Sequence, residues 1–193
     1  MITLLLADAE MEWYRSGDRT ILLDRYRGGP EDLLTDTRRG RPDVVHSFLN
    51  MSLRSPLRGK GLEVMVHTRQ DKLLIFGQDA SVPADYLQFL QLLDPLMRNG
   101  SIGEGEAAIR LLDASFEKVV DGRKVLVFSP QGRRSDLSKV LKSKEEGWTA
   151  VIGGFTEGDF LSPVYQRADE VVSLGGELLT VPLVLCQALN ALE

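Results

Sequence analysis

Short apolar segments alternate with helical ones from residue 124 to the end of the chain, and this alternation constrains the fold most strongly. The runs at 124–128, 148–152 and 169–174 have the length of strands, whereas 135–143 and 180–192 have helical periodicity. Strands that alternate with helices form a parallel sheet, and ligands of such sheets bind at the carboxyl ends of the strands. The sequence therefore predicts an α/β protein with a mostly parallel sheet.

The first part of the chain is expected to add strands and helices to the same body. Residues 2–7, 62–68 and 72–76 are predicted strands, the last two joined by a hairpin turn at 69–71. The predicted helices span 31–34, 43–53, 82–97 and 104–116. Because no linker or repeat divides the chain, we expect one domain over residues 1–193. An arginine loop with helical and hairpin elaborations would occupy about 30–120, and the ligand-binding part about 124–193.

Composition excludes several classes of protein. The chain has 193 residues, a net charge of −5 and one cysteine, Cys186. No internal disulfide can form, which fits a reducing cytoplasm. Cys186 lies on an apolar helix and is expected to be a small buried hydrophobe. No apolar run is long enough to cross a bilayer, and residues 1–7 lack the basic start of a signal peptide. We therefore expect a cytoplasmic protein with no membrane partner, and no cluster has the spacing of metal ligands.

Three arginines, Arg38, Arg39 and Arg41, are crowded just before Pro42 and a predicted helix. Guanidinium groups this close repel one another, so the carboxylate of Asp43 or an anion from outside must balance them. Arginine suits bidentate binding of phosphate. Residues 38–72 hold eight basic and three acidic residues, in a chain whose net charge is −5. The pattern favours either a solvated loop with an internal Arg41–Asp43 pair or a site for a localised anionic partner.

Two glycine pairs, Gly153-Gly154 and Gly175-Gly176, directly follow predicted strands. Glycine permits close approach of the backbone to a ligand, although each pair alone is more typical of a turn. Apolar walls would come from Phe128, Phe155, Leu174 and Leu179. The pattern G-x-G-x-x-A at 103–108 indicates dinucleotide binding only after a strand. Because it follows a predicted helix, we interpret it as an interhelical loop.

Three blocks of sequence, taken together, are more specific than any single motif. The first block is Arg-Gly-Arg-Pro-Asp-Val-Val-His, which begins at Arg39, together with residues 55–57 and 62–68. The second is Ile-Gly-Gly-Phe-Thr-Glu-Gly, which begins at Ile152, and the third is the segment 170–180. In this order and spacing they resemble the ribosome-biogenesis pseudouridine N1-methyltransferases of the SPOUT superfamily. The resemblance implies a homodimeric SPOUT-type fold with a C-terminal trefoil knot, a rare exception to the rule against threaded chains.

The resemblance also implies a cofactor and a reaction. S-adenosyl-L-methionine would lie in the knot, and its contacts carried over by position fall on Val127, Phe128, Ser129, Gly153, Gly158, Leu174, Gly175, Gly176, Glu177, Leu178 and Leu179. The methyl acceptor would be N1 of a pseudouridine in small-subunit ribosomal RNA. Arg41 would favour negative charge on the ring, and Asp43 would hold Arg41 or, less readily, accept the proton. His46 and His67 are expected to pack, not to catalyse.

The expected RNA surface departs from the family pattern. The family grips phosphates with three arginines that correspond here to Ser81, Ala84 and Gln88, and their loss would flatten the salt dependence of binding. The candidate RNA contacts are Arg38, Arg39, Arg41, Arg54, Arg58, Lys60, Ser81, Ala84 and Gln88. Three functions therefore stay open. The first is a pseudouridine methyltransferase of small-subunit biogenesis. The second is a non-catalytic RNA-binding assembly factor that retains the knot and works by binding RNA or assembly proteins. The third is a SPOUT methyltransferase with another RNA substrate.

Overall fold

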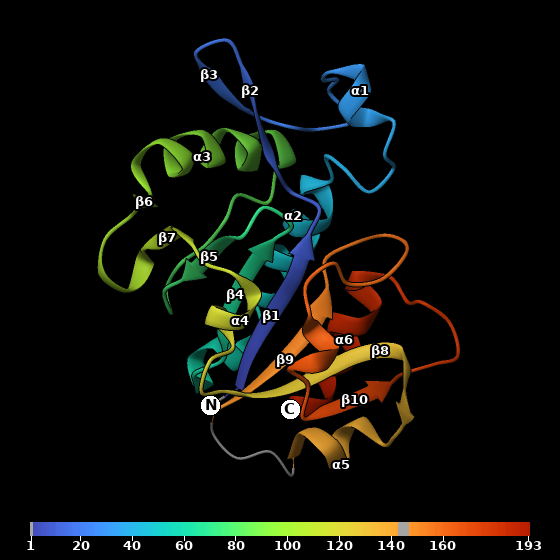
Figure 1. Cartoon of the computed structure of the whole chain (residues 1–193). Helices are drawn as coiled ribbons and strands as arrows, with labels where there is room; N and C mark the ends of the chain where they lie inside the picture. The colour runs from blue at the N-terminus through green and yellow to red at the C-terminus, as the bar shows by residue number, and fades with distance from the viewer. Residues whose placement is uncertain (1, 143–146) are drawn as a thin grey trace.

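The computed structural model describes residues 2–142 and 147–193, and a mixed sheet forms its centre (Figure 1). Within these residues the sheet has eight strands in the order β10-β8-β9-β1-β4-β5-β7-β6. Their bounds are β1 Ile2–Ala9, β4 Glu63–Thr68, β5 Lys72–Phe76, β6 Ser101–Ile102, β7 Ile109–Asp113, β8 Lys124–Arg134, β9 Trp148–Gly153 and β10 Glu170–Ser173. Neighbours from β10 to β4 pair in parallel, and those from β4 to β6 pair antiparallel. The predicted parallel sheet thus continues into an antiparallel edge.

The helices cover the sheet and one hairpin stands apart from it. The helices are α1 Glu31–Leu34, α2 Pro42–Ser52, α3 Tyr86–Asn99, α4 Phe116–Val119, α5 Leu137–Lys142 and α6 Val181–Leu192, with 3₁₀ turns at Pro56–Lys60, Gly105–Ala107 and Val164–Gln166. Strands β2 (Trp13–Ser16) and β3 (Arg19–Leu22) form a separate hairpin that the sequence analysis missed. Ser143, the last residue of a predicted helix, lies outside the described residues.

Strand β1 is buried on both faces because its side chains alternate between two apolar layers. Leu4 and Leu6 pack in the cluster that includes α2, α3, α5 and α6, whereas Leu5 and Ala7 pack with α4 on the opposite face. Consecutive side chains of a strand point to opposite faces. A nearly continuous apolar run is therefore what a central strand with both faces covered requires.

The predicted helix at 104–116 is wrong. Residues 109–113 instead form β7, which pairs antiparallel with β5, Ile109 lying opposite Phe76. Gly103 and Gly105 have positive φ values of 74° and 55°, a conformation that breaks a helix. The free edge of β5 offers backbone partners that a short helix could not use. The G-x-G-x-x-A segment is consequently a loop between two strands, and the interhelical interpretation is wrong as well.

Helix α3 begins four residues later than predicted. Its first turn is capped by Asp85, whose side chain accepts a hydrogen bond of 2.9 Å from the amide of Gln88. Pro83 therefore belongs to the preceding loop. Gly100 ends the helix in the left-handed conformation with φ 72°, as the Asn-Gly pair predicts.

Helix α6 leaves one face open to solvent. It packs against α2 and α5, while Leu183, Cys186 and Asn190 form an exposed row on its outer side. The expectation of a buried Cys186 is therefore wrong. Helix α6 is apolar over more of its circumference than the neighbouring helices cover, and Cys186 lies on the uncovered part. In the described part of the chain, no helix combines the length and the apolarity that a membrane span needs.

Gly132 is required where β8 passes β10. A Cβ atom there would lie 2.6 Å from the carbonyl carbon of Val172 and 2.7 Å from that of Val171, and strand backbone cannot rotate away. Gly132→Ala should lower the free energy of unfolding by roughly 2 kcal/mol or more in urea titration. Gly59→Ala is the control, because no atom lies within 4 Å of the added methyl group. Equal stability of the two variants would contradict this packing.

Candidate functional site

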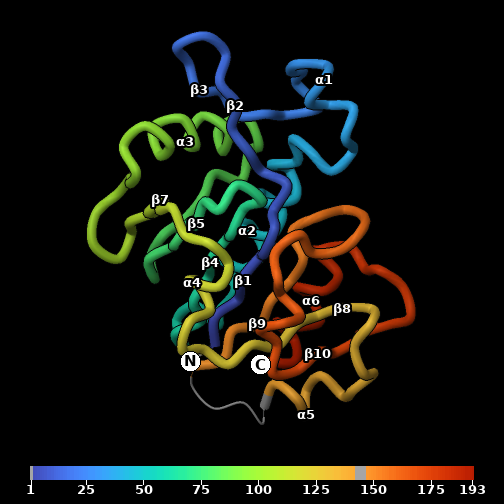
Figure 2. Tube along the Cα trace, in the orientation of Figure 1, coloured from blue at the N-terminus to red at the C-terminus, as the bar shows by residue number. Residues whose placement is uncertain are grey.

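A pocket lies beside the middle of β8 and the carboxyl ends of β9 and β10. This is the edge at which a parallel sheet binds ligands. Residues of the loops after β9 and β10, whose paths are traced in Figure 2, line it together. Nine of the predicted cofactor residues line it, namely Phe128, Ser129, Gly153, Gly158, Leu174, Gly175, Glu177, Leu178 and Leu179. Val127 does not, because its side chain points into the core, and Gly176 is not part of the lining.

Other lining residues were not among those predicted. They are Pro130, Gln131, Ile152, Phe155, Asp159, Phe160, Tyr165, Val181 and Val184, of which Phe155 alone was expected as an apolar wall. Most belong to the loop 155–165 and to the first turn of α6. The sequence carried no periodic signal there, since only the path of the chain brings this loop back over β8.

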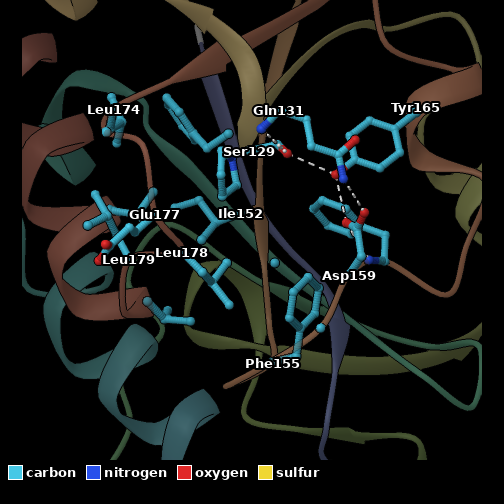
Figure 3. A pocket seen from close by; sticks show the side chains of 18 residues that line it. Ser129, Gln131, Ile152, Phe155, Asp159, Tyr165, Leu174, Glu177, Leu178 and Leu179 are labelled. Atoms are coloured by element: carbon cyan, nitrogen blue, oxygen red, sulfur yellow. Dashed lines mark hydrogen bonds between the residues drawn. The ribbon is translucent and has the colours of Figure 1, made fainter.

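One side of the pocket is a connected set of polar groups (Figure 3). Tyr165 donates to Asp159 Oδ1 at 2.6 Å and lies 2.9 Å from Ser129 Oγ, while Gln131 donates to Asp159 Oδ2 at 2.8 Å. Burial and the hydrogen bond to Asp159 raise the pKa of Tyr165 to about 12. The phenol therefore stays protonated at neutral pH, so Ser129 must be the donor to Tyr165.

The opposite side of the pocket is mostly apolar, with Leu174, Leu178 and Leu179 across Ile152 from the polar groups and Glu177 beside them (Figure 3). Gly153 has no room for a side chain, since a Cβ atom would lie 2.5 Å from the ring of Phe155. A side chain at position 153 would therefore displace the ring of Phe155, whereas the sequence analysis ascribed this glycine to close approach of the backbone to a ligand. An adenosyl group fits such a site, because apolar walls can enclose a base while the polar side meets hydroxyl or amino groups.

Asp8 fixes the loop that carries Asp159. This buried side chain, at the end of β1, accepts hydrogen bonds of 2.7 and 2.8 Å from the amides of Leu161 and Ser162. Asp8 has a positive φ of 52°, which aspartate tolerates better than most residues. In this backbone conformation the carboxylate of Asp8 reaches the loop that contains Leu161 and Ser162. Asp159 and its neighbours are held in place by the central strand.

Buried carboxylates, not external anions, balance two of the crowded arginines. Arg38 Nε lies 3.0 Å from Glu10 Oε1, and Arg39 forms a bidentate pair with Glu12 at 2.7 and 3.0 Å. Arg38 also donates to the carbonyl of Asp159 at 2.9 Å. Burial raises the pKa of Glu10, while Arg38 acts against that rise. Both side chains are committed to internal pairs, which argues against their predicted role in RNA binding.

Arg41 presents its guanidinium at the edge of a second pocket. Its Nε and Nη2 donate to the two oxygens of Asp43 at 2.9 and 2.8 Å, which raises the pKa of Arg41 and keeps it charged. The pairing inferred from the sequence is thus present. The second pocket is lined by Arg41, Asp43 and part of α2, and it shares Phe155, Leu178, Leu179 and Val181 with the first. Arg41 therefore lies next to the predicted cofactor pocket.

The remaining predicted RNA residues do not gather around Arg41. Helix α2 is 11 residues, about 16 Å, long, and exposed Arg54 and Lys60 follow its far end, where β4 begins. Arg58 is buried, and its guanidinium donates to the carbonyls of Leu62 and Gly77. This burial argues against the predicted contact of Arg58 with RNA, because a guanidinium held by these two carbonyls is not exposed to a phosphate.

The loop before α3 lies nearer to Arg41. The carbonyl of Pro83 is 2.8 Å from His46 Nε2, one turn into α2, and the flanking Ser81 and Ala84 are exposed, as is Gln88. His46 is buried and stacks on Phe89 at 4.6 Å between ring centroids. His67 is fully buried, 3.1 Å from Asp71. Both histidines pack inside the protein, as expected.

Together the fold and the site define an α/β protein with a ligand pocket at the edge of its parallel strands and an adjoining arginine–aspartate pair. The sequence family described as EMG1/NEP1 methyltransferase matches residues 4–193. The ribosomal RNA small subunit methyltransferase Nep1 of Pyrobaculum aerophilum is 37% identical over 200 residues, which cover 98% of this chain and 87% of the relative. That of Methanothrix thermoacetophila is 33% identical over 153 residues, which cover 76% of this chain and 67% of the relative.

A solved structure agrees with these sequence relatives. The crystal structure of Archaeoglobus fulgidus Nep1 bound to S-adenosylhomocysteine matches with a TM-score of 0.83 and 29% identity, covering 98% of this chain and 96% of that one. The chain belongs to the EMG1/NEP1 methyltransferase family.

The Arg39–Glu12 pair should be structural. Arg39→Ala leaves the carboxylate of Glu12, 2% exposed, without its partner, so the free energy of unfolding should fall by about 3 kcal/mol in urea titration. The double variant Glu12→Leu/Arg39→Leu should recover much of that loss, because removing both charges leaves none buried alone. If Arg39→Ala were fully stable and only RNA binding weakened, the sequence-based role of Arg39 would be right and this one wrong.

Proposed function

We propose that the protein transfers a methyl group from S-adenosyl-L-methionine to N1 of a pseudouridine in small-subunit ribosomal RNA, as a step of small-subunit biogenesis. The observation that carries the proposal is the shared wall of the two pockets. One holds the predicted cofactor residues and the other the Arg41–Asp43 pair. A cofactor in the first and a nucleobase in the second would meet across Phe155, Leu178 and Leu179.

The first pocket supports S-adenosyl-L-methionine by its chemistry. The cofactor carries a positive sulfonium and an ammonium group, and the pocket offers the carboxylates of Asp159 and Glu177 beside its apolar wall. An added Cβ atom at Gly175, which lines the pocket, would meet no atom within 4 Å, so the loop after β10 leaves open space there. The Nep1 of Archaeoglobus fulgidus, similar in fold, binds the demethylated product S-adenosylhomocysteine.

The second pocket supports the acceptor chemistry. The bound cofactor supplies an electrophilic methyl group, and transfer depends mainly on placing the nucleophile in line with it. As N1 bonds to the methyl carbon, the carbon–sulfur bond breaks and its electron pair stays on sulfur, while the N1 proton passes to a base or to water. Arg41 would stabilise negative charge on the uracil ring. Asp43 serves chiefly to orient it, because both its oxygens accept from Arg41.

Two further properties of the family belong to the same proposal. We infer a trefoil knot in the segment from β8 to α6, supported by the family and by the tight passage of Gly132 against β10.

We also infer a homodimer. The exposed row Leu183, Cys186 and Asn190 on α6 is a face that a second copy would cover, with Leu183 46% exposed.

The non-catalytic assembly factor is the second candidate, and a different RNA substrate is the third. The internal pairing of Arg38 and Arg39 and the burial of Arg58 leave few cations to hold an RNA for catalysis. This favours the second candidate, because an assembly factor can act by binding a protein as well as RNA. The Arg41–Asp43 pair next to the cofactor pocket favours catalysis, since an assembly factor needs no such adjacency.

The reaction is tested with a small-subunit RNA hairpin that carries either pseudouridine or uridine at one position. Calorimetry should first show that S-adenosylhomocysteine binds, and that Gly153→Val abolishes binding by displacing the ring of Phe155, while Gly59→Val does not. Methyl transfer should then occur to the pseudouridine hairpin alone, because the sugar blocks N1 of uridine's ring. Arg41→Ala should lower kcat by about 10²–10³-fold, and Asp43→Asn less, with cofactor affinity unchanged in both.

Each result separates the candidates. Methylation of both hairpins would point to another RNA chemistry. Methylation of neither, with cofactor and RNA both bound, would favour the assembly factor. Loss of cofactor affinity in Arg41→Ala would contradict the separation of the two pockets.

The dimer is tested by sedimentation. The wild type should sediment as a dimer at micromolar concentration, and Leu183→Arg should shift it toward monomer by placing a charge in the interface. Leu112→Arg is the matched control, because Leu112 is also exposed, at 47%, but lies on β7 at the far edge of the sheet. A monomeric wild type would overturn the inference.

A further inference from the structure

The turn from Asp24 to Gly28 holds an aromatic ring and a guanidinium out to solvent. Tyr26 is 66% exposed, the most exposed large hydrophobic side chain among the described residues, and Arg27 is exposed next to it. The turn itself is well bonded, since the amides of Tyr26 and Arg27 donate to Asp24 at 3.0 and 3.1 Å. Buried Leu23 anchors its start. An exposed ring on so fixed a turn is available to a partner.

This turn is attached to the arginine loop. The amide of Arg25 donates to the carbonyl of Gly40 at 3.0 Å, and its guanidinium donates to the carbonyl of Thr37 at 2.6 Å. The guanidinium carbon of Arg41 lies 5.6 Å from the centroid of the Tyr26 ring, within the range of a cation–π contact. The ring of Tyr26 therefore borders the group that would contact the target base.

The same turn is attached to the start of α3. The hydroxyl of Tyr86 donates to Asp24 Oδ2 at 2.9 Å, and burial with this bond raises the pKa of Tyr86. Tyr86 lies between Ala84 and Gln88, two of the exposed positions that carry no cation here. In Figure 1 the chain between β3 and α1 accordingly crosses above α2, near the first turn of α3. Arg27 thus places a cation near the start of α3, where Ala84 and Gln88 carry none.

We propose that the turn is an RNA contact in which Tyr26 stacks on a base that flanks the target nucleotide and Arg27 contacts a phosphate. The inference rests on the proposed RNA substrate and adds a binding element to it. Sequence-specific proteins bind RNA at loops whose unstacked bases lie on aromatic side chains, and every base offers a face for stacking. Arg27 has no ion pair within residues 2–142 and 147–193, whereas Arg38, Arg39 and Arg69 are paired with carboxylates.

Binding is measured with the pseudouridine hairpin carrying 2-aminopurine on either side of the target position. Stacking on Tyr26 should quench the fluorescence at one of the two positions when the wild type binds. Tyr26→Ala should abolish that quenching and weaken RNA binding by about 5- to 100-fold, whereas Tyr26→Phe should stay within about twofold because the ring is kept. Arg27→Ala should reduce the slope of log affinity against log salt by about 0.7.

The controls are Leu112→Ala for loss of exposed apolar surface and Arg98→Ala for loss of an exposed charge, and neither should alter the quenching or the slope. All variants should bind S-adenosylhomocysteine like the wild type. Unchanged RNA binding and quenching in Tyr26→Ala, while the wild type methylates the hairpin, would overturn this inference alone. A wild type that binds no RNA would overturn both proposals. A shift of Tyr26→Ala in sedimentation, with RNA binding intact, would assign the turn to a protein contact instead.

Discussion

The paired charges at the end of β1 hold the site together. Glu10 and Glu12 are both almost fully buried, and each receives the guanidinium of a neighbouring arginine from the loop at 36–41. Losing one partner of such a pair leaves a buried charge without compensation. The backbone of Glu10 adds to this, because its carbonyl accepts from Arg41 and its amide donates to Gly154. The arginine loop and the glycine loop are therefore both fastened to the central strand.

This fastening joins the two halves of the site. Arg38 stacks over Phe155 at 4.9 Å while bonded to Glu10, and Phe155 lines both pockets. A shift of either loop would move the shared wall. The arrangement fits a reaction that depends on the placement of two reactants, because a misplacement of about 1 Å can lower a rate a hundredfold. Of the arginines in the loop, Arg41 alone keeps its guanidinium at the second pocket.

The regular elements were largely predictable, and the errors have physical reasons. Strands such as 148–152 and helices such as 180–192 follow from local apolar periodicity, which the structure retains. The pattern of residues 109–113 is compatible with a helix or a strand. These residues form a strand because the edge of β5 offers backbone hydrogen-bond partners. Cys186 was misjudged because periodicity gives the apolar face of a helix but not how much of it neighbours cover. The burial of Arg58 was not predicted, because a charged residue is expected at the surface unless the carbonyls that its side chain contacts are known.

By itself, the sequence determined the α/β class, the positions of the glycine loops and the local Arg41–Asp43 pair, since each depends on residues close together in the chain. The tertiary structure decided which charges remain for a ligand. Glu10 and Glu12 precede their arginine partners by 28 and 27 positions, and Asp8 on the first strand binds the loop that follows Asp159. Such pairs form because the path of the chain through the sheet brings residues that are distant in sequence together, and no local sequence pattern predicts them.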